Sequence, residues 1–315
     1  MTKTMLVLGA TGGVGGAVTR AMLKRGWQVR ALVRTPDRAA TGWKDAQAPH
    51  WIKGDAMSRD DVTRAARGVS VIFHGVNPPG YRDWENTVLP MIDNTIAAAR
   101  AAGGARIVLP GTIYNYDPAE ISLVDGETPQ RPKGKKGAIR VELESRLTHA
   151  APDVPSLIAR AGDFFGPDVG QSWFAQAMAK PPLKRIINPG SSGIGHAWAY
   201  VPDLAEAIVR LLELPAGRLL PAECVQFAGF WDADGSDMVA AIRRAAHAPR
   251  LPVRRFPWWL MRALSPFGGF PREVMEVLPF WNHAVRLDNS RLVTLLGTEP
   301  HTDLDQAVAT TLAAS

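Results

Sequence analysis

A glycine-rich turn near the N-terminus constrains this chain more than any other stretch. Residues 9–15 lie between an apolar run, 5–8, and a segment, 14–24, whose apolar side chains recur at helical spacing. Strand, glycine turn and helix in that order form the context that a dinucleotide fingerprint requires. Glycine permits a tight turn and leaves no side chain to hold a phosphate away, while the helix N-terminus offers N–H groups to a pyrophosphate. We therefore predict a nucleotide site rather than an ordinary strand-to-helix turn. Its contacts are assigned to Gly9, Thr11, Gly12, Gly13, Val14 and Gly15.

Strand-like and helical segments alternate through the first two thirds of the chain, without hairpin signals. This alternation predicts an α/β fold with a doubly wound parallel sheet of the Rossmann type. The pattern loosens from Gly162, and 249–283 is rich in proline and tryptophan. We expect the nucleotide domain to comprise 1–161 and 197–230. A smaller, mostly helical substrate lobe is expected to comprise 162–196 and 231–315.

The end of the second expected strand, 27–33, bears on which nucleotide binds. In a dinucleotide fold this position faces the adenosine ribose, where an acid accepts from the 2′-hydroxyl and an arginine favours a 2′-phosphate. The chain has Arg34 there, with no acid before Asp37. We predict NADP(H), with NAD(H) as the alternative cofactor and a solvated loop arginine as the alternative interpretation.

Several motifs in order resemble the atypical or extended short-chain dehydrogenase/reductase superfamily, of the NAD-dependent epimerase/dehydratase type. Besides the glycine turn they are Gly54-Asp55, Pro110-Gly111-Thr112, Glu127-Thr128-Pro129, Phe165-Gly166-Pro167 and Tyr200-Val201-Pro202-Asp203-Leu204-Ala205. The resemblance implies that Asp55 and Ala56 meet the adenine and that Val76, Asn77 and Pro78 lie along the nicotinamide-side ribose. It also implies that Thr112 hydrogen-bonds the substrate oxygen.

The tyrosine and lysine that this superfamily uses for catalysis, four residues apart, are missing. None of the four tyrosines has a lysine four residues on, and the best register puts Lys136 on the tyrosine position and Arg140 on the lysine position. Three accounts follow. Lys136 serves as an unconventional acid, Tyr114 or Tyr81 supplies a phenol from a nearby loop, or the protein binds nucleotide without hydride chemistry. Arg140 retains donors for a ribose in each account.

Further candidates lie on the substrate side, namely Asp163, Phe164 and His196. Together these residues favour an NADP(H)-dependent oxidoreductase that acts on a carbonyl or alcohol of a small organic molecule. A non-catalytic nucleotide-binding regulator or redox sensor is the second hypothesis. A sugar-nucleotide epimerase or dehydratase is weaker, since it relies on the missing tyrosine.

Composition restricts the remaining classes of partner. The net charge of +6 comes from scattered residues, 36 basic against 30 acidic, so we expect no nucleic-acid partner. A single cysteine excludes an intrachain disulfide, and we expect no metal site because no cluster has ligand spacing. No apolar run is long enough for a membrane span, and we expect a cytoplasmic protein without membrane contact, although the sequence allows a homodimer. The segment 256–270 is interpreted as part of the lobe rather than as a membrane-surface or partner-binding helix, since it shows no clean basic amphipathic face.

Overall fold

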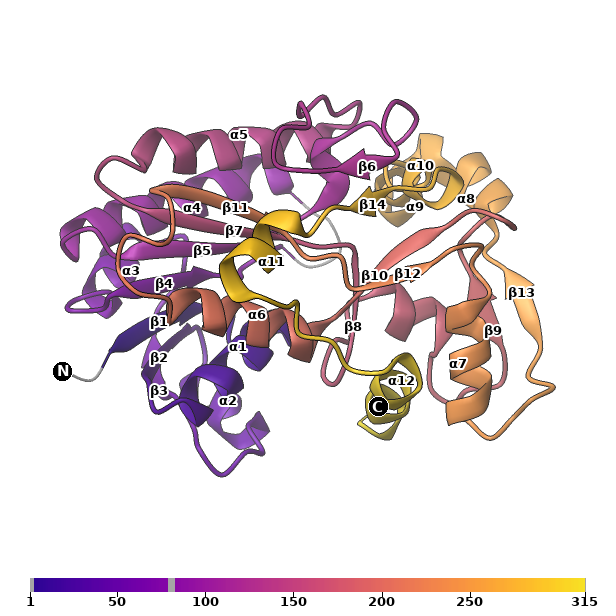
Figure 1. Cartoon of the computed structure of the whole chain (residues 1–315), viewed down its shortest axis with the longest axis horizontal. Helices are drawn as coiled ribbons and strands as arrows, with labels where there is room; N and C mark the ends of the chain where they lie inside the picture. The colour runs from indigo at the N-terminus through magenta and orange to yellow at the C-terminus, as the bar shows by residue number, and fades with distance from the viewer. Residues whose placement is uncertain (1–2, 79–82, 315) are drawn as a thin grey trace.

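The computed structural model describes residues 3–78 and 83–314, and its centre is a seven-stranded parallel sheet (Figure 1). The strand order is β11-β7-β5-β4-β1-β2-β3, with every neighbouring pair in parallel register. The strands are β1 (Thr4–Leu8), β2 (Gln28–Val33), β3 (His50–Lys53), β4 (Val71–His74), β5 (Arg106–Gly111), β7 (Ser156–Arg160) and β11 (Ala222–Gln226). The expected doubly wound α/β sheet is confirmed.

The central strand β1 is buried on both faces, because it is apolar at successive positions. In β1, Met5 and Val7 join the core on one face, and Leu6 and Leu8 join the core on the other. Such two-sided burial is what a parallel sheet covered by helices requires. The first face is covered by α1 (Gly13–Lys24), α6 (Val201–Leu212) and α11 (Ser290–Leu296); the second by α3 (Arg59–Ala65), α4 (Trp84–Ala101) and α5 (Lys135–Ala150). A short helix, α2 (Pro36–Gly42), connects β2 to β3.

The long connection after β5 carries little regular structure before α5 begins. It contains a 3₁₀ turn, η2 (Ile113–Asn115), and the two-residue strand β6 (Leu123–Val124). β6 pairs in parallel with β14 (Arg286–Leu287), which comes from the C-terminal third of the chain. This pairing ties the loop to a distant segment that sequence spacing does not indicate.

A second body lies beyond the carboxyl ends of the main strands (Figure 1). Its three-stranded sheet, in the order β12-β10-β8, packs with helices around an aromatic core of its own. Its strands are β8 (Asp163–Phe165), β9 (Ile186–Asn188), β10 (His196–Tyr200), β12 (Phe230–Asp232) and β13 (Val253–Arg255). Its helices are η3 (Phe174–Met178), α7 (Asp237–Ala245), α8 (Trp258–Leu264), η4 (Ser265–Phe267), α9 (Gly269–Met275), α10 (Pro279–Asn282) and α12 (Leu304–Ala313).

The helices within residues 3–78 and 83–314 include none whose length and apolar character would let it cross a bilayer.

The carboxyl ends of the main strands meet the second body at one edge of the sheet. Open α/β sheets bind their ligands at this edge.

Candidate functional site

The turn between β1 and α1 leaves no room for side chains at Gly9 and Gly15. Gly9 has φ +94°, a conformation that glycine adopts readily, and its carbonyl accepts from the Gly12 N–H at 3.0 Å. A Cβ on Gly15 would lie 2.2 Å from the Gly9 carbonyl oxygen, and one on Gly9 would lie 2.6 Å from the Gly75 oxygen. The turns after β1 and β4 are therefore in contact through bare backbone. Residues of this kind fit a nucleotide that must approach the main chain closely.

The first turn of α1 is free to meet an anion. Its N-cap, Gly12, has no side-chain cap, and the described first turn of the helix holds no acidic residue. The helix dipole and its N–H groups therefore favour negative charge there. Thr11 is exposed at the turn, and Val14 packs partly against the core. A Cβ on Gly13 would lie 2.9 Å from Val169 Cγ2, so this face of the helix closes against the segment after β8.

Arg34 follows directly after β2 and is exposed. Within the described parts of the chain it has neither a hydrogen bond nor an ion pair. Its guanidinium is thus not committed to a protein carboxylate. Its contact with the 2′ position of an adenosine stays a prediction.

The loop after β3 is held rigidly in place beside β2. The Asp55 N–H donates to Asp61 Oδ2 at 3.1 Å, Asp55 Oδ1 accepts from the Met57 N–H at 2.9 Å, and the Ala56 carbonyl accepts from Asn94 Nδ2 at 3.0 Å. Hydrogen bonds from Arg64 and from the Asp55 N–H hold the pKa of Asp61 below its usual value, so Asp61 stays an acceptor. The loop assigned to adenine is preorganised by these bonds.

The loop after β4 meets α5 through one of the predicted residues. Arg140 Nη2 donates to Asn77 Oδ1 at 3.1 Å, and its guanidinium lies 4.9 Å from the centre of the Trp84 ring. Arg140 and Asn77 were assigned to the nicotinamide-side ribose separately, and the structure brings them together. Val76 and Pro78 are half-buried in this loop, whereas Tyr81 lies outside the described residues.

A buried histidine stands immediately before that loop. His74 is 2% exposed, and its Nδ1 lies 2.8 Å from Thr95 Oγ1. Burial, with a smaller contribution from the charge of Arg140, lowers the pKa of His74 to about 3. The imidazole is therefore neutral at ordinary pH and packs as a structural group beneath the loop.

Thr112 follows β5 and caps η2. Its Oγ1 accepts from the Tyr114 N–H at 3.3 Å, and its carbonyl accepts from Arg160 Nη1 at 2.6 Å. Arg160, at the end of β7, forms a two-point ion pair with Glu144 of α5, at 3.0 and 2.7 Å. Burial opposes the charge of Arg160, but the Glu144 carboxylate more than offsets this and its pKa is raised. A buried ion pair thus fixes the backbone that carries Thr112.

Lys136 is held by two carboxylates that the sequence did not indicate. It lies in the first turn of α5 with 5% of its side chain exposed, and its Nζ forms ion pairs with Glu273 of α9 and, at 3.3 Å, with Glu276. The Lys136 N–H also donates to Glu276 Oε2 at 3.1 Å. Two carboxylates therefore engage the Lys136 ammonium. An acid role for Lys136 would require that a substrate oxygen compete with these carboxylates.

A mainly apolar cavity of about 60 Å³ adjoins Lys136. The Tyr114 ring lines it, with its centre 5.2 Å from that of Phe280. Burial raises the pKa of the neighbouring Tyr116 to about 12, so that side chain remains a neutral phenol. The other lining residues are Asp117, Pro118, Lys133, Gly134, Gly137, Glu276, Val277 and Pro279. Tyr114 thus contacts Thr112 through its backbone N–H and lines the same cavity as Lys136.

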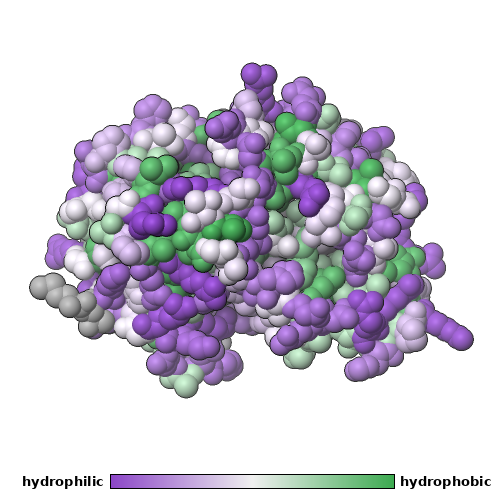
Figure 2. Space-filling model, in the orientation of Figure 1, coloured by the Kyte–Doolittle hydropathy of each residue, from purple (hydrophilic) through white to green (hydrophobic). Residues whose placement is uncertain are grey.

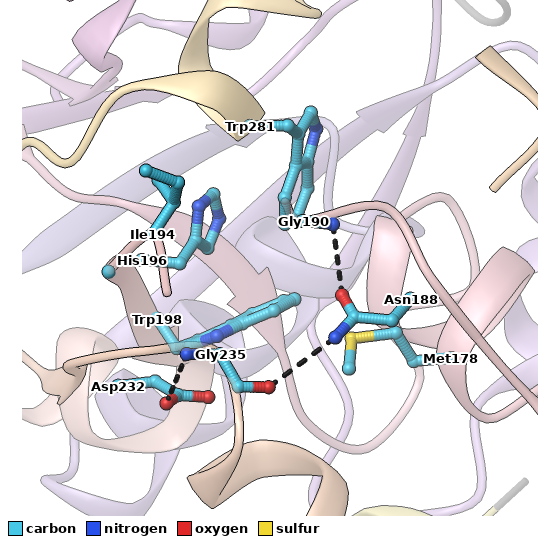
Figure 3. A pocket seen from close by; sticks show the side chains of 10 residues that line it. Met178, Asn188, Gly190, Ile194, His196, Trp198, Asp232, Gly235 and Trp281 are labelled. Atoms are coloured by element: carbon cyan, nitrogen blue, oxygen red, sulfur yellow. Dashed lines mark hydrogen bonds between the residues drawn. The ribbon is translucent and has the colours of Figure 1, made fainter. Parts of the chain in front are cut away.

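A second, smaller cavity is lined in part by Trp281 of α10, and Figure 3 shows the side chains around it. His196 Nε2 lies 2.8 Å from Asp163 Oδ2, and the imidazole stacks on Trp281 with ring centres 3.9 Å apart. Two of the predicted substrate-side residues therefore form a pair. Phe164 points to the other side of β8, where it packs partly against the core of the main sheet.

Sequence reasoning missed Glu273, Glu276 and the Arg160–Glu144 pair. The signal for Arg160 was present, since an arginine ending an apolar strand needs a buried counter-charge. Nothing in local spacing links Lys136 to Glu273 and Glu276, which follow it by more than a hundred positions in the sequence. Among residues 3–78 and 83–314, no group of three or more His, Cys, Asp or Glu is placed to hold a metal ion.

Comparisons with known proteins agree with this geometry. Residues 9–136 match a family model described as NAD(P)H-binding. The chain is similar to a 3-diazoavenalumate denitrifying reductase of Streptomyces sp., 24% identical over 84% of this chain and 91% of that protein. It is also similar to a ceramide reductase of Caulobacter vibrioides, 28% identical over 78% of this chain and 71% of that protein.

The solved structures show the same architecture. A UDP-glucuronic acid 4-epimerase from Bacillus cereus, in complex with UDP-glucuronic acid and NAD, superimposes with a TM-score of 0.77. It covers 99% of this chain and 98% of its own at 16% identity, which supports the fold alone. Residues 9–136 are therefore similar to an NAD(P)H-binding domain, and the chain as a whole has the fold of the NAD-dependent epimerases and dehydratases.

Proposed function

We propose that the protein is a cytoplasmic NADP(H)-dependent oxidoreductase that reduces a carbonyl or oxidises an alcohol of a small organic molecule. The observation that carries the cofactor preference is Arg34, exposed at the end of β2 and without a carboxylate partner in the described residues. A 2′-phosphate supplies the missing counter-charge, and a guanidinium fits it by a two-point contact. We assign the nucleotide to 1–161 and 197–230, and the substrate to the lobe of 162–196 and 231–315.

The residues present fit a dinucleotide, because backbone packs directly on backbone at Gly9 and Gly15 and the α1 N-terminus carries no side-chain cap. The α1 N-terminus would hold the pyrophosphate, Asp55 and Ala56 the adenine, and Asn77 with Arg140 the second ribose. A nicotinamide supplies hydride chemistry when bound. Thr112 would position the substrate oxygen, and its backbone is fixed by Arg160 for this purpose.

The proton donor is assigned to Lys136 or Tyr114. Lys136 is cationic and would have to leave one of its carboxylates to donate to a substrate oxygen. Tyr114 lies on the same cavity and offers a phenol. Asp163 and His196 would shape the far side of the substrate lobe, where their hydrogen bond fixes the imidazole.

A second candidate function is a nucleotide-binding regulator or sensor without turnover. The ion pairs of Lys136 with Glu273 and Glu276 favour this second function. These carboxylates occupy the N–H groups of Lys136 that would have to donate a proton to a substrate. A panel of aldehydes and ketones distinguishes the two candidates. Oxidation of NADPH by any member supports the reductase, whereas nucleotide binding with no turnover across the panel supports the regulator.

Titration with NADPH and NADH tests the cofactor preference. NADPH should bind more tightly, and Arg34→Ala should weaken it about tenfold while leaving NADH unchanged, as for loss of one charge-assisted contact. Arg250→Ala, which removes an exposed arginine in the lobe, is the matched control. Equal affinities of the parent protein for both nucleotides would refute the assignment of Arg34.

A further inference from the structure

Large apolar side chains are exposed together on three short elements of the lobe. Trp259 is 74% exposed, Phe267 87% and Phe270 50%, and Leu264 is 39% exposed beside them. They belong to α8, η4 and α9, residues 258–275, which we call the α8–α9 hairpin. The described large apolar residues exposed elsewhere lie scattered along the chain: Met57, Leu123, Leu220 and Val253. Scattered apolar residues need no explanation, but a gathered set indicates a binding surface.

The inner side of the hairpin is firmly anchored, so the exposure is not a loose end of the chain. Trp258 Nε1 donates to the Pro189 carbonyl at 2.8 Å. Its ring packs against Phe256 and Trp173, with ring centres 4.6 and 5.6 Å apart. The next residue, Trp259, faces away from this cluster. Helix α8 contains no buried residue, so the hairpin presents one broad side to its surroundings.

The bend of the hairpin packs α8, η4 and α9 against one another, so their exposed residues belong to one compact surface. Gly268 and Gly269 have φ +83° and +64°, which reverse the chain between η4 and α9. Arg272 crosses the bend and donates to the Ser265 and Pro266 carbonyls at 3.3 and 3.0 Å. The surface is assembled from several short elements rather than from one helix. For this reason, the sequence of 256–270 shows no amphipathic pattern of a single helix.

The charged residues in this part of the sequence are all basic. Residues 253–272 contain Arg254, Arg255, Arg262 and Arg272, all exposed, and no aspartate or glutamate. The first acids that follow, Glu273 and Glu276, are half-buried and paired with Lys136. The strand that pairs with β13 is preceded by two more exposed basic residues, Lys184 and Arg185.

We propose that the α8–α9 hairpin docks on a bilayer surface that carries anionic headgroups. Tryptophan and phenylalanine enter the interfacial region, and arginines beside them pair with lipid phosphates. A second copy fits less well, because a two-fold interface would place the same arginines opposite one another. The hairpin lies at the end of the molecule away from β3 and the N-terminus (Figure 1), and hydrophobic patches appear among hydrophilic ones at that end (Figure 2). This proposal does not depend on hydride chemistry.

Flotation of the full chain with lipid vesicles tests it. The protein should bind vesicles of phosphatidylcholine with phosphatidylglycerol and should bind pure phosphatidylcholine weakly. Rising salt should release it, because screening weakens the arginine contacts. Arg262→Gln should lower the partition coefficient about fivefold. The triple variant Trp259→Ser, Phe267→Ser, Phe270→Ser should lower it about a hundredfold.

Leu220→Ser is the matched control, since Leu220 is 56% exposed and precedes β11, at the amino ends of the main strands and away from the lobe. It should leave the partition coefficient unchanged. Circular dichroism and NADPH binding show that each variant is folded. Failure of the parent protein to bind anionic vesicles at low salt overturns the proposal. So does equal binding by the triple variant, or a parent dimer that the triple variant dissociates, since the surface would then belong to a second copy.

Discussion

Replacing Lys136 with methionine separates the structural role of this residue from a chemical one. Methionine has a similar length and no charge, so Lys136→Met keeps the packing and removes the ammonium. It leaves Glu273 and Glu276 beside each other without their cation. Breaking a fully buried ion pair costs about 3–5 kcal/mol. Because 31% and 27% of the two glutamate side chains are exposed, water can reach them, and we expect about 2 kcal/mol.

Chemical denaturation measures this loss, and thermal unfolding should show a fall in Tm of about 4 °C for a chain of this size. Lys135→Met, at the exposed neighbouring position, should change the free energy of unfolding by less than about 0.5 kcal/mol. Adding Glu273→Gln and Glu276→Gln to Lys136→Met should recover most of the loss, because the two carboxylates no longer repel each other. Equal stability of the Lys136→Met and Lys135→Met proteins would refute a stabilising role for the ion pairs of Lys136.

Turnover gives a separate readout on the same variants. If Lys136 is the proton donor, Lys136→Met abolishes NADPH oxidation and leaves NADPH affinity nearly unchanged. Lys136→Arg keeps the ion pairs but hardly releases a proton, so it should retain stability and lose turnover. Retained turnover in either variant would remove Lys136 as the acid and leave Tyr114.

Two further predictions concern buried groups near the site. The pKa of His74 is lowered to about 3 in the folded protein, so the unfolded chain takes up the proton first as pH falls below about 6.5. His74 should therefore cost about 2 kcal/mol of stability between pH 7 and pH 5, and His74→Asn should flatten that part of the profile; an unchanged slope would contradict the burial argument. Glu144→Gln should destabilise by about 3–5 kcal/mol, because Arg160 keeps a buried charge without its carboxylate. Glu144→Leu combined with Arg160→Met should recover most of this in urea unfolding, and no recovery would show that the Thr112 contact dominates.

The sheet and the glycine turn were predictable because their signals are local. Central strands such as β1 are short apolar runs, and helices such as α1 and α6 repeat their apolar residues at helical spacing. The turn at 9–15 needs only glycine and its two neighbouring elements. The position of Arg34 follows from the end of β2, and it therefore also followed from the sequence.

The contacts of Lys136 with Glu273 and Glu276 were not predictable, because the partners lie more than a hundred residues apart in the sequence. The exposed surface on 258–275 was also hidden, since three short elements and a glycine bend assemble it and no single periodicity describes it. His196 and Asp163 were found as separate candidates, but their hydrogen bond depends on the pairing of β10 with β8.

The sequence by itself determined the glycine turn at the end of β1 and predicted a dinucleotide site there, because backbone geometry and helix N–H groups act over a few residues. Only the tertiary structure decided what surrounds the position where a tyrosine is expected. There, the lobe brings Glu273 and Glu276 onto Lys136, and charges that are far apart in the chain interact only once the two bodies have packed.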